Sequence, residues 1–396
     1  MKYALLIGDG MADFPQKSLD NKTPLEYALT PHMDACAHDG IVGKVQTVPS
    51  GMPPGSDVAN MSLMGYDPQQ YYDGRAPIEA ASMGVDLRQG DKAFRCNLVN
   101  LDSKNMVDYS SGHIETDDAH AIIGELKESL DSDSVCFHPG VSYRHLAVVS
   151  DFPEGDLKCT PPHDISGREY KPFLPQGTGQ ERVLDLFYQA RDILARSPVN
   201  KKRISRGKCP VTDIWLWGQG SAIALPTLAE RYSLSGSVVS AVDLVKGLGV
   251  LAGLTVCNVP GATGYLDTNY AGKVSAAATA LETQDFVYLH VEAPDETSHE
   301  GSLEKKITAI EAFDRNVVGE IRKLKDQMKD LRICVLPDHA TPVSMKTHHD
   351  MPVPYAMCGT HIAANHAQTY CEKSAHDSEI VSGVELFDRF IKGNFD

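Results

Sequence analysis

Short apolar runs rich in branched side chains alternate with helical patterns along much of the chain. The runs at 3–7, 285–293 and 331–337 are almost continuously apolar. Strands of this kind are buried on both faces, as in a parallel sheet covered by helices. Between the last two runs, apolar residues recur every three or four positions across 302–328, which predicts an amphipathic helix. Strand, helix and strand in this order form a βαβ unit, so the predicted fold class is α/β.

The middle of the chain follows a different pattern. Shorter candidate strands at 92–101 and 143–150 enclose a predicted helix at 117–130, and a Pro-rich, loop-like run follows at 159–179. The α/β pattern resumes with VTDIWLWGQG at 211–220.

Two domains are therefore expected, because 396 residues exceed a typical single core. The larger domain is discontinuous, with a mostly parallel sheet flanked by helices, and is predicted to comprise 1–84 and 176–396. A smaller α+β domain is predicted to be inserted at 85–175. Hinges are expected near 73–77 and 160–179.

Three aspartates lie just past the carboxyl ends of three predicted strands: Asp9, Asp295 and Asp338. In an open α/β sheet, ligands bind at that edge. A single acidic residue after a strand usually belongs to a turn or caps a helix. The histidines that accompany these aspartates change that interpretation.

Asp295 and His299 are four residues apart, so they are neighbours on one face of a helical turn. His339 follows Asp338 directly, and His348 and His349 precede a Pro-Val-Pro segment. Each histidine taken alone is better explained as a surface residue or as a core residue bonded to a carbonyl. Clustered aspartate and neutral histidine instead supply the ligands that Mn²⁺ or Zn²⁺ prefer, and two such ions assist phosphoryl transfer.

One serine lies in a bed of glycine and proline, in PSGMPPGSDVAN at 49–60. Ser56 fits the N-cap of a helix, for which serine is a preferred residue. It also fits a nucleophile, because a serine hydroxyl activated by a metal ion needs no neighbouring histidine base. The helix start would add backbone N–H groups for a phosphate.

The composition limits the classes of molecule that the protein is expected to bind. The formal net charge of −16 argues against nucleic acid and anionic membranes, although a few arginines or a metal still accommodate an anionic substrate. No apolar run approaches the roughly 20 residues that span a bilayer. Nine cysteines without a C-x-x-C pair indicate reduced thiols, so a cytoplasmic location is expected.

Ordered motifs along nearly the whole chain resemble one family. They include LLIGDGMAD, GSDVANMSLMGYDP, FRCNLV, GVSYRHL, PPHD, WLWGQG, AVDLVKG, VPGATGYLDTNY, DETSH, PDH and the H-x-x-x-PVP at 348–354. The chain resembles the cofactor-independent phosphoglycerate mutases of the shorter archaeal-type branch, within the alkaline phosphatase superfamily. The resemblance implies an isomerase that interconverts 3- and 2-phosphoglycerate through a phosphoserine, as in glycolysis. It implies two divalent ions, Mn²⁺ foremost with Mg²⁺, Zn²⁺ or Co²⁺ as alternatives, and no 2,3-bisphosphoglycerate.

The resemblance also assigns roles by residue. Ser56 matches the serine that becomes phosphorylated. Asp9, Ser56, Asp338 and His339 match the ligands of one ion, and Asp295, His299 and His348 match those of the other. His348 is favoured over His349 because it precedes Pro352 by four residues. The candidate substrate contacts are Arg95, Arg144, His145, Lys246, His113, His163 and Asp164.

Three other readings remain open from the sequence. Part of the same branch is proposed to act as homoserine kinase, with a shared metal site and serine but a different donor and acceptor. A metal-dependent phosphatase or phosphodiesterase is another enzyme reading, and a non-catalytic relative is a third. The partner is expected to be a small phosphorylated molecule, and the oligomeric state is left open.

Overall fold

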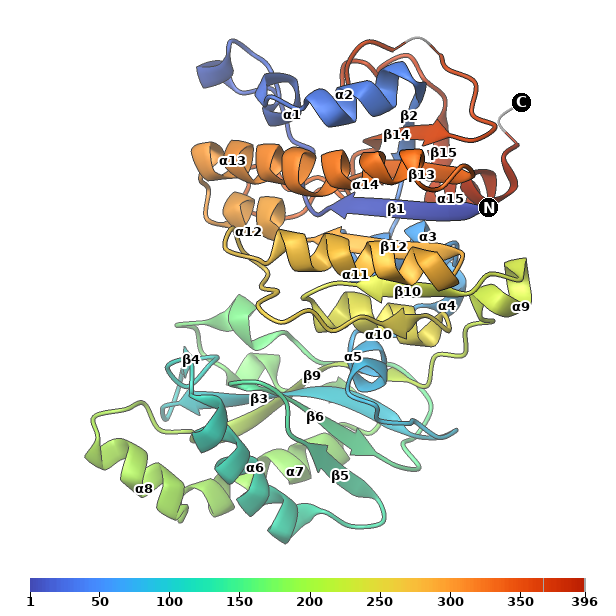
Figure 1. The fold of residues 1–396 in the computed structure, drawn as a ribbon. Coiled ribbons are helices and arrows are strands. Elements are labelled where there is room, and N and C mark those ends of the chain that lie inside the picture. Colours follow the sequence, from blue (N-terminus) through green and yellow to red (C-terminus); the bar gives the residue numbers. More distant parts are fainter. Residues whose placement is uncertain (366, 395–396) are drawn as a thin grey trace. The chain divides into compact units, whose positions relative to one another are not determined.

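The apolar runs predicted as strands lie together in one sheet of the computed structural model, which describes residues 1–365 and 367–394 (Figure 1). Within that described part the sheet has eight strands in the order β11-β10-β12-β1-β13-β14-β2-β15. Its strands are β1 (Lys2–Gly8), β2 (Gly40–Gln46), β10 (Gly236–Val239), β11 (Thr255–Val256), β12 (Phe286–Val291), β13 (Leu331–Leu336), β14 (Val353–Gly359) and β15 (Ile380–Ser382). Strand β14 is antiparallel to both of its neighbours, and the other pairs are parallel. The predicted α/β class is therefore confirmed.

Helices cover both faces of this sheet (Figure 1). Alternate residues of β1 divide between the faces, and Ala4 and Leu6 join the core beneath one set of helices. That set contains α2 (Pro31–His38), α11 (Tyr270–Thr283) and α13 (Leu303–Phe313). The opposite face carries α3 (Ser56–Leu63) and α15 (Gly383–Lys392), which contact each other.

The predicted helix at 302–328 is one helical run with a change of winding. Helix α13 passes into a π turn at Asp314–Val318, then into α14 (Gly319–Lys323) and a 3₁₀ turn at Leu324–Asp326. The Asp314 carboxylate in the π turn accepts hydrogen bonds from the backbone N–H groups of His32 and Met33, at 3.1 and 2.7 Å. The irregular turn thus caps the first turn of α2.

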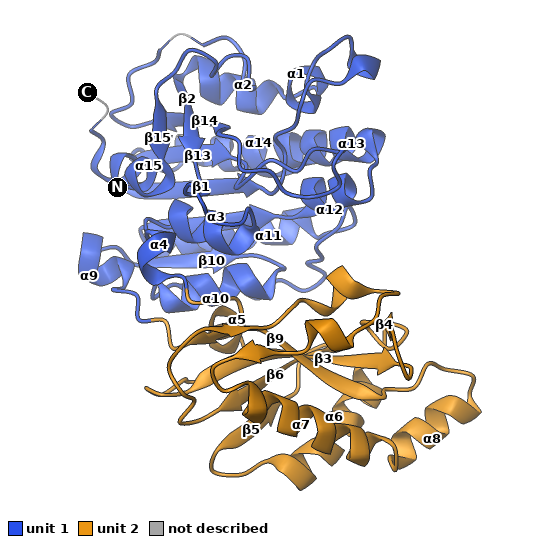
Figure 2. Ribbon diagram, turned by 180° about the vertical axis from the view of Figure 1, so that it is seen from behind, with its two compact units in different colours: residues 1–72, 224–396 blue, residues 73–223 orange. Residues whose placement is uncertain are grey.

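The chain divides into two compact units (Figure 2). Unit 1 comprises Met1–Tyr72 and Ala224–Asp396, and unit 2 comprises Asp73–Ile223. Unit 2 is built on β3 (Lys92–Leu101), which pairs antiparallel with β6 (Arg144–Val149) and β9 (Asp213–Ser221). Helices α6 (Thr116–Leu130) and α7 (Gln180–Leu194) share a core with one face of this sheet, and α5 (Ala76–Ser82) packs on the other.

Unit 2 is longer than the segment 85–175 that the sequence suggested. The run at 211–220 forms β9 beside β3, and does not return to the large sheet. A strand buried on both faces suits either sheet, so its apolar pattern does not reveal its partner. The chain passes between the units at 72/73 and 223/224, so 73–77 lies next to the first of these passages and 160–179 lies inside unit 2.

All nine cysteines are free thiols. Among the described residues, no helix combines the length and apolar character needed to cross a bilayer.

A buried lysine joins the loop after β1 to the loop after β13. Lys306 Nζ donates to Asp13 Oδ2 at 2.9 Å, to Ala12 O at 3.2 Å and to Thr341 O at 2.9 Å. Asp13 N–H in turn donates to Glu372 Oε1 at 3.1 Å. Burial of the carboxyl raises the pKa of Glu372 from 4.5 to about 7.

The raised pKa of Glu372 predicts a pH-dependent stability. Between about pH 4.5 and 7 the folded protein holds a proton that the unfolded chain has released, so the free energy of unfolding falls as pH rises through this window. Glu372→Gln removes this loss. Urea unfolding at pH 5 and pH 8 gives the free energy of unfolding of both proteins. We expect the difference, variant minus wild type, to be about 2–3 kcal/mol larger at pH 8 than at pH 5. An equal difference at both pH values would contradict the assignment.

Candidate metal centre

The three aspartates meet at one edge of the large sheet because their strands are parallel neighbours. Asp9 follows β1, Asp338 follows β13, and Asp295 lies in α12 (Ala293–His299), the short helix directly after β12. All three side chains are buried. Their carboxylates form two clusters with three histidines, and within each cluster one ligand atom per residue lies within 4.8 Å of the others.

The first cluster consists of Asp9, Asp338 and His339. His339 Nε2 lies 3.5 Å from Asp9 Oδ1 and 3.6 Å from Asp338 Oδ2. Ser56 Oγ lies 3.1 Å from the same Nε2 atom. The serine hydroxyl therefore faces the cluster to which the family resemblance assigned it.

The second cluster consists of Asp295, His299 and His348. His299 Nε2 lies 3.1 Å from both Asp295 Oδ2 and His348 Nε2. The predicted i, i+4 relation holds, because α12 carries Asp295 and His299 on successive turns. His349 turns elsewhere: its ring packs edge-on against Phe14, and its Nδ1 accepts the Met351 N–H at 3.0 Å.

Hydrogen bonds to the far side of two rings fix which nitrogen faces the clusters. Thr341 Oγ1 donates to Asp295 Oδ1, so it accepts from His339 Nδ1–H at 3.1 Å. His299 Nδ1–H donates to the Lys346 carbonyl at 3.0 Å. In both rings Nε2 is then the nitrogen that points into a cluster, the arrangement that outer hydrogen bonds impose on metal-binding histidines. The hydrogen bond to Asp295 raises the pKa of His299 to about 9, so a cation bound there would displace the proton on its Nε2.

The first cluster has a negative charge that the described residues do not balance. Asp9 Oδ1 is buried and has no hydrogen-bond partner among them. Burial, and then the nearby carboxylates of Asp338 and Asp295, raise the pKa of Asp9 well above its usual range. A divalent cation would satisfy this oxygen, so carboxylate oxygens, imidazole nitrogens and an unpartnered buried acceptor together fit metal binding.

The structure corrects one expectation for Ser56. The N-cap position of α3 belongs to Gly55, and Ser56 is the first residue of the helix. Its side chain makes no capping hydrogen bond and instead approaches His339. Asp57 Oδ1 accepts the Val58 N–H at 3.0 Å, and the described residues offer no acceptor to the N–H groups of Ser56 and Asp57.

Two buried polar side chains at this edge were missed by the sequence analysis. His290 on β12 places Nε2 3.1 Å from Asp9 Oδ2. Asn60, one turn after Ser56 on α3, donates to Asp338 Oδ2 at 2.7 Å. A single histidine inside an apolar strand is a detectable signal for His290, whereas nothing local marks Asn60.

Unit 2 brings Arg95 and Arg144 to the same face of its sheet. Asn97 on β3 pairs with Arg144 on β6, and side chains two residues apart on a strand share a face. Arg95 is buried, pairs with Glu79 Oε2 at 2.9 Å and lies over the Trp217 ring at 4.2 Å. Arg144 is exposed, and its guanidinium lies 5.2 Å from the centre of the Tyr143 ring.

Aromatic contacts link two further candidates to this face. The His163 ring contacts Trp217 and Tyr109, with centroids 5.3 and 6.1 Å apart. The His113 ring contacts Tyr109 and Tyr143 at 6.3 and 5.8 Å. Together with the two arginines they form a polar and aromatic patch on one face of unit 2.

The remaining candidates lie apart from that patch or at its margin. His145 follows Arg144 on β6 and so points to the opposite face, where burial lowers its pKa to about 3. Asp164 is exposed and its Oδ1 lies 3.5 Å from His163 Nε2. Lys246 belongs to unit 1, on α10 (Asp243–Leu251), where it pairs with Asp243 at 3.3 Å.

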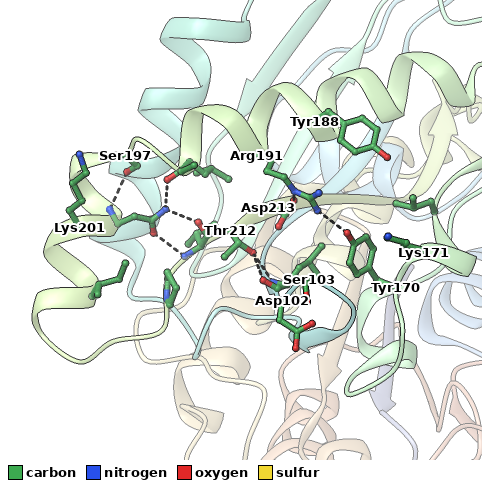
Figure 3. Close-up of a pocket in the computed structure, with 18 residues that line it drawn as sticks. Asp102, Ser103, Tyr170, Lys171, Tyr188, Arg191, Ser197, Lys201, Thr212 and Asp213 are labelled. Carbon is green, nitrogen blue, oxygen red and sulfur yellow. Dashed lines mark hydrogen bonds and ion pairs between the residues drawn. The ribbon is translucent and has the colours of Figure 1, made fainter.

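A separate pocket of about 880 Å³ lies within unit 2 (Figure 3). The segment 101–103, α7, α8 (Pro198–Ser205) and the start of β9 line it. Arg191 projects from α7 between Asp213 and Tyr170, donating to them at 2.6 and 3.3 Å. None of the candidate substrate residues lines this pocket.

A family model and two similar proteins that match this chain carry the same description. A family model described as 2,3-bisphosphoglycerate-independent phosphoglycerate mutase matches residues 37–200. Proteins of that name from Methanosarcina acetivorans and Methanosarcina barkeri are 51% and 50% identical to this chain. The first alignment covers 98% of this chain and 94% of the relative, and the second covers 99% and 100%.

Two solved structures share the fold over the whole chain. A protein from Pyrococcus horikoshii aligns with a TM-score of 0.82 at 27% identity, covering 100% of this chain and 98% of that one. A cofactor-independent phosphoglycerate mutase from Thermoplasma acidophilum aligns with a TM-score of 0.68 at 28% identity, covering 99% of both chains.

The two clusters predict that each chain binds two divalent ions, measurable by isothermal titration calorimetry with Mn²⁺ as the probe. Loss of an outer hydrogen-bond partner of a metal ligand costs roughly 10–100-fold in affinity. Removal of a ligand should cost no less, so we expect His348→Ala to weaken one of the two sites at least tenfold. His349→Ala is the matched control, because its ring lies outside the cluster. Equal effects of the two substitutions would contradict the second site.

Proposed function

Since the chain belongs to the 2,3-bisphosphoglycerate-independent phosphoglycerate mutase family, we propose that it interconverts 3-phosphoglycerate and 2-phosphoglycerate. The proposed nucleophile is Ser56, and the proposed ligands of two divalent ions are the six aspartates and histidines of the clusters together with Ser56. The observation that carries this proposal is the approach of Ser56 Oγ to within 3.1 Å of His339 Nε2, beside a buried carboxylate oxygen without a partner.

The proposed reaction has two phosphoryl transfers. In the first, the bond between phosphorus and the C3 oxygen of 3-phosphoglycerate breaks and a bond from Ser56 Oγ to phosphorus forms, while the serine proton passes to the leaving oxygen. In the second, the C2 hydroxyl of the retained glycerate takes the phosphoryl group and its proton returns to Ser56. No net oxidation or hydrolysis occurs, so the reaction needs no co-substrate.

Bound divalent ions would supply the positive charge that lowers the pKa of the serine hydroxyl and stabilises the phosphoryl oxygens. The protein contributes the orientation. Ser56 lies at the first position of α3, where the free N–H groups of Ser56 and Asp57 point out of the helix end. Backbone donors at a helix start favour a phosphate group, so they would hold the transferring group beside Oγ.

We propose Mn²⁺ as the native metal. Three of the six side-chain ligands in the clusters are imidazoles. Mg²⁺ prefers an all-oxygen shell with several waters, whereas Mn²⁺ tolerates mixed oxygen and nitrogen ligands. Zn²⁺ and Co²⁺ would also be compatible with this ligand set.

Binding of the substrate carboxylate is proposed for the arginines of unit 2. Arg95 is already paired with Glu79, whereas no ion pair of Arg144 is found among the described residues. Guanidinium groups bind carboxylates through two parallel hydrogen bonds, which gives both affinity and orientation. Lys246 in unit 1 is the proposed additional phosphate contact, and His113, His163, Asp164 and His145 are weaker candidates.

A paired assay on the purified protein tests the activity. With Mn²⁺ present, we expect 3-phosphoglycerate to be converted to 2-phosphoglycerate with almost no release of inorganic phosphate, and homoserine not to be phosphorylated by ATP. Ser56→Ala should abolish the conversion and the phosphoprotein detected by mass spectrometry, since no other hydroxyl would replace Oγ.

Ser50→Ala is the matched control, since Ser50 is an exposed serine of the same Gly/Pro-rich segment. It should retain full activity. Far-UV circular dichroism and the thermal midpoint check that both variants fold. A fully active Ser56→Ala protein would overturn the mechanism, and efficient homoserine phosphorylation would overturn the proposed substrate.

Arg144→Met tests carboxylate binding. A hydrogen bond to a charged group contributes roughly 1.5–3 kcal/mol, equivalent to about 10–100-fold in binding, so KM for 3-phosphoglycerate should rise by that factor. Arg182→Met is the control, because the Arg182 guanidinium also lies over an aromatic ring of unit 2, at 5.6 Å from Phe152. An unchanged KM in Arg144→Met would remove Arg144 from the substrate site.

A further inference from the structure

The mechanism leaves unexplained two buried polar side chains that connect the start of α3 to Asp338. We propose that Asn60 and Tyr288 are positioning residues, which hold the first turn of α3 and the carboxylate of Asp338 in one fixed relation. The proposal deepens the proposed function, because it concerns the nucleophile and one metal ligand of the same site. Both side chains are fully buried.

The amide of Asn60 makes two hydrogen bonds from one nitrogen. Nδ2 donates to the backbone carbonyl of Ser56 at 2.7 Å and to Asp338 Oδ2 at 2.7 Å. An amide nitrogen has two hydrogens, so both are used. The same planar group therefore contacts the backbone of the nucleophile and the side chain of a metal ligand.

Tyr288 fixes the orientation of that amide. The Tyr288 hydroxyl donates to Asn60 Oδ1. If the amide were turned over, its oxygen would face a carbonyl and a carboxylate, neither of which can donate. Without the tyrosine hydroxyl, Oδ1 of Asn60 would lose its hydrogen bond from Tyr288 while staying buried, and the amide would gain freedom to rotate.

The connection crosses three elements that are far apart in sequence. Asn60 lies on α3, Tyr288 lies in the middle of β12, and Asp338 follows β13. Strand β12 pairs with β1, and β1 pairs with β13. Tyr288 therefore lies on an interior strand of the sheet, two strands from the one that Asp338 follows. The hydroxyl thereby ties α3 to the sheet that carries the aspartates.

One carboxylate oxygen of Asp338, Oδ2, accepts its hydrogen bond from Asn60. Its Oδ1 accepts N–H groups from Gly10 and His339 at 3.2 and 2.8 Å, whereas Asn60 Nδ2 is the donor to Oδ2 among the described residues. A carboxylate held by donors on both oxygens has one preferred rotation. Loss of the Asn60 contact would free Oδ2 and let Ser56 move relative to the metal ligand.

Tyr288→Phe tests the proposal because it removes only the hydroxyl. Outer-shell substitutions of this kind cost roughly 10–100-fold in metal affinity or activity. We expect about a tenfold loss in Mn²⁺ affinity, measured calorimetrically without substrate, and about a tenfold loss in kcat, with KM for 3-phosphoglycerate changed less than twofold. Tyr3→Phe is the matched control. Tyr3 is a buried tyrosine near the amino end of β1, away from Asp9, and its hydroxyl donates to Ile391 O at 3.0 Å.

A double substitution shows whether Tyr288 acts through Asn60. If it does, adding Tyr288→Phe to Asn60→Ala should lower Mn²⁺ affinity no further than Asn60→Ala alone. Additive losses, or Tyr288→Phe retaining both Mn²⁺ affinity and kcat within twofold of wild type, would overturn the proposal. If Asn60→Ala fails to fold, the Tyr288→Phe and Tyr3→Phe pair decides. An inactive wild type would overturn the proposed function alone, because Mn²⁺ binding is measured separately.

Discussion

Mutual repulsion among three buried carboxylates is the constraint on which this edge of the molecule depends. Asp9, Asp295 and Asp338 are placed together by the parallel pairing of β12, β1 and β13. Buried like charges raise one another's pKa and disfavour the compact state unless donors or cations oppose them. Backbone N–H groups and Asn60 offset the charge of Asp338, and Thr341 and His299 offset that of Asp295. Among the described residues, none forms a hydrogen bond with Asp9 Oδ1.

This imbalance links metal binding to folding. The same groups that would bind divalent ions are those whose charges oppose packing of the sheet edge, so bound ions would stabilise the folded state as well as supply charge for catalysis. Lys306 shows another way to oppose the charge of a buried aspartate in the loop after β1. There, the Lys306 side chain is buried against Asp13 and two backbone carbonyls, where burial lowers the pKa of its ammonium and Asp13 opposes that shift. The protein thus opposes the Asp13 carboxylate with an internal lysine, whereas the carboxylates of the two clusters face histidines and, in the proposed mechanism, divalent ions.

The sequence was sufficient where local pattern and chain direction decide the outcome. Apolar runs identified β1, β12 and β13, and an aspartate after each had to reach the same edge once the strands were parallel. The spacing of Asp295 and His299 likewise needed only one helical turn. The sequence was insufficient where a side chain or strand contacts a residue far away in the chain. Asn60 and Tyr288 are separated by 228 residues, and β9 has an apolar pattern that suits either sheet. The family resemblance grouped His145 with Arg144, whereas adjacent residues of a strand face opposite ways.

The position of β1 has a consequence for synthesis of the protein. This apolar strand lies between β12 and β13, which begin at Phe286 and Leu331. At about 5–20 residues per second, the ribosome delivers the second neighbour roughly 15–65 s after β1 has been made. Unit 2, which is contiguous, has all of its residues available long before then. The nascent chain therefore carries an unpaired apolar strand through most of translation, and cellular chaperones have a defined interval in which to shield it.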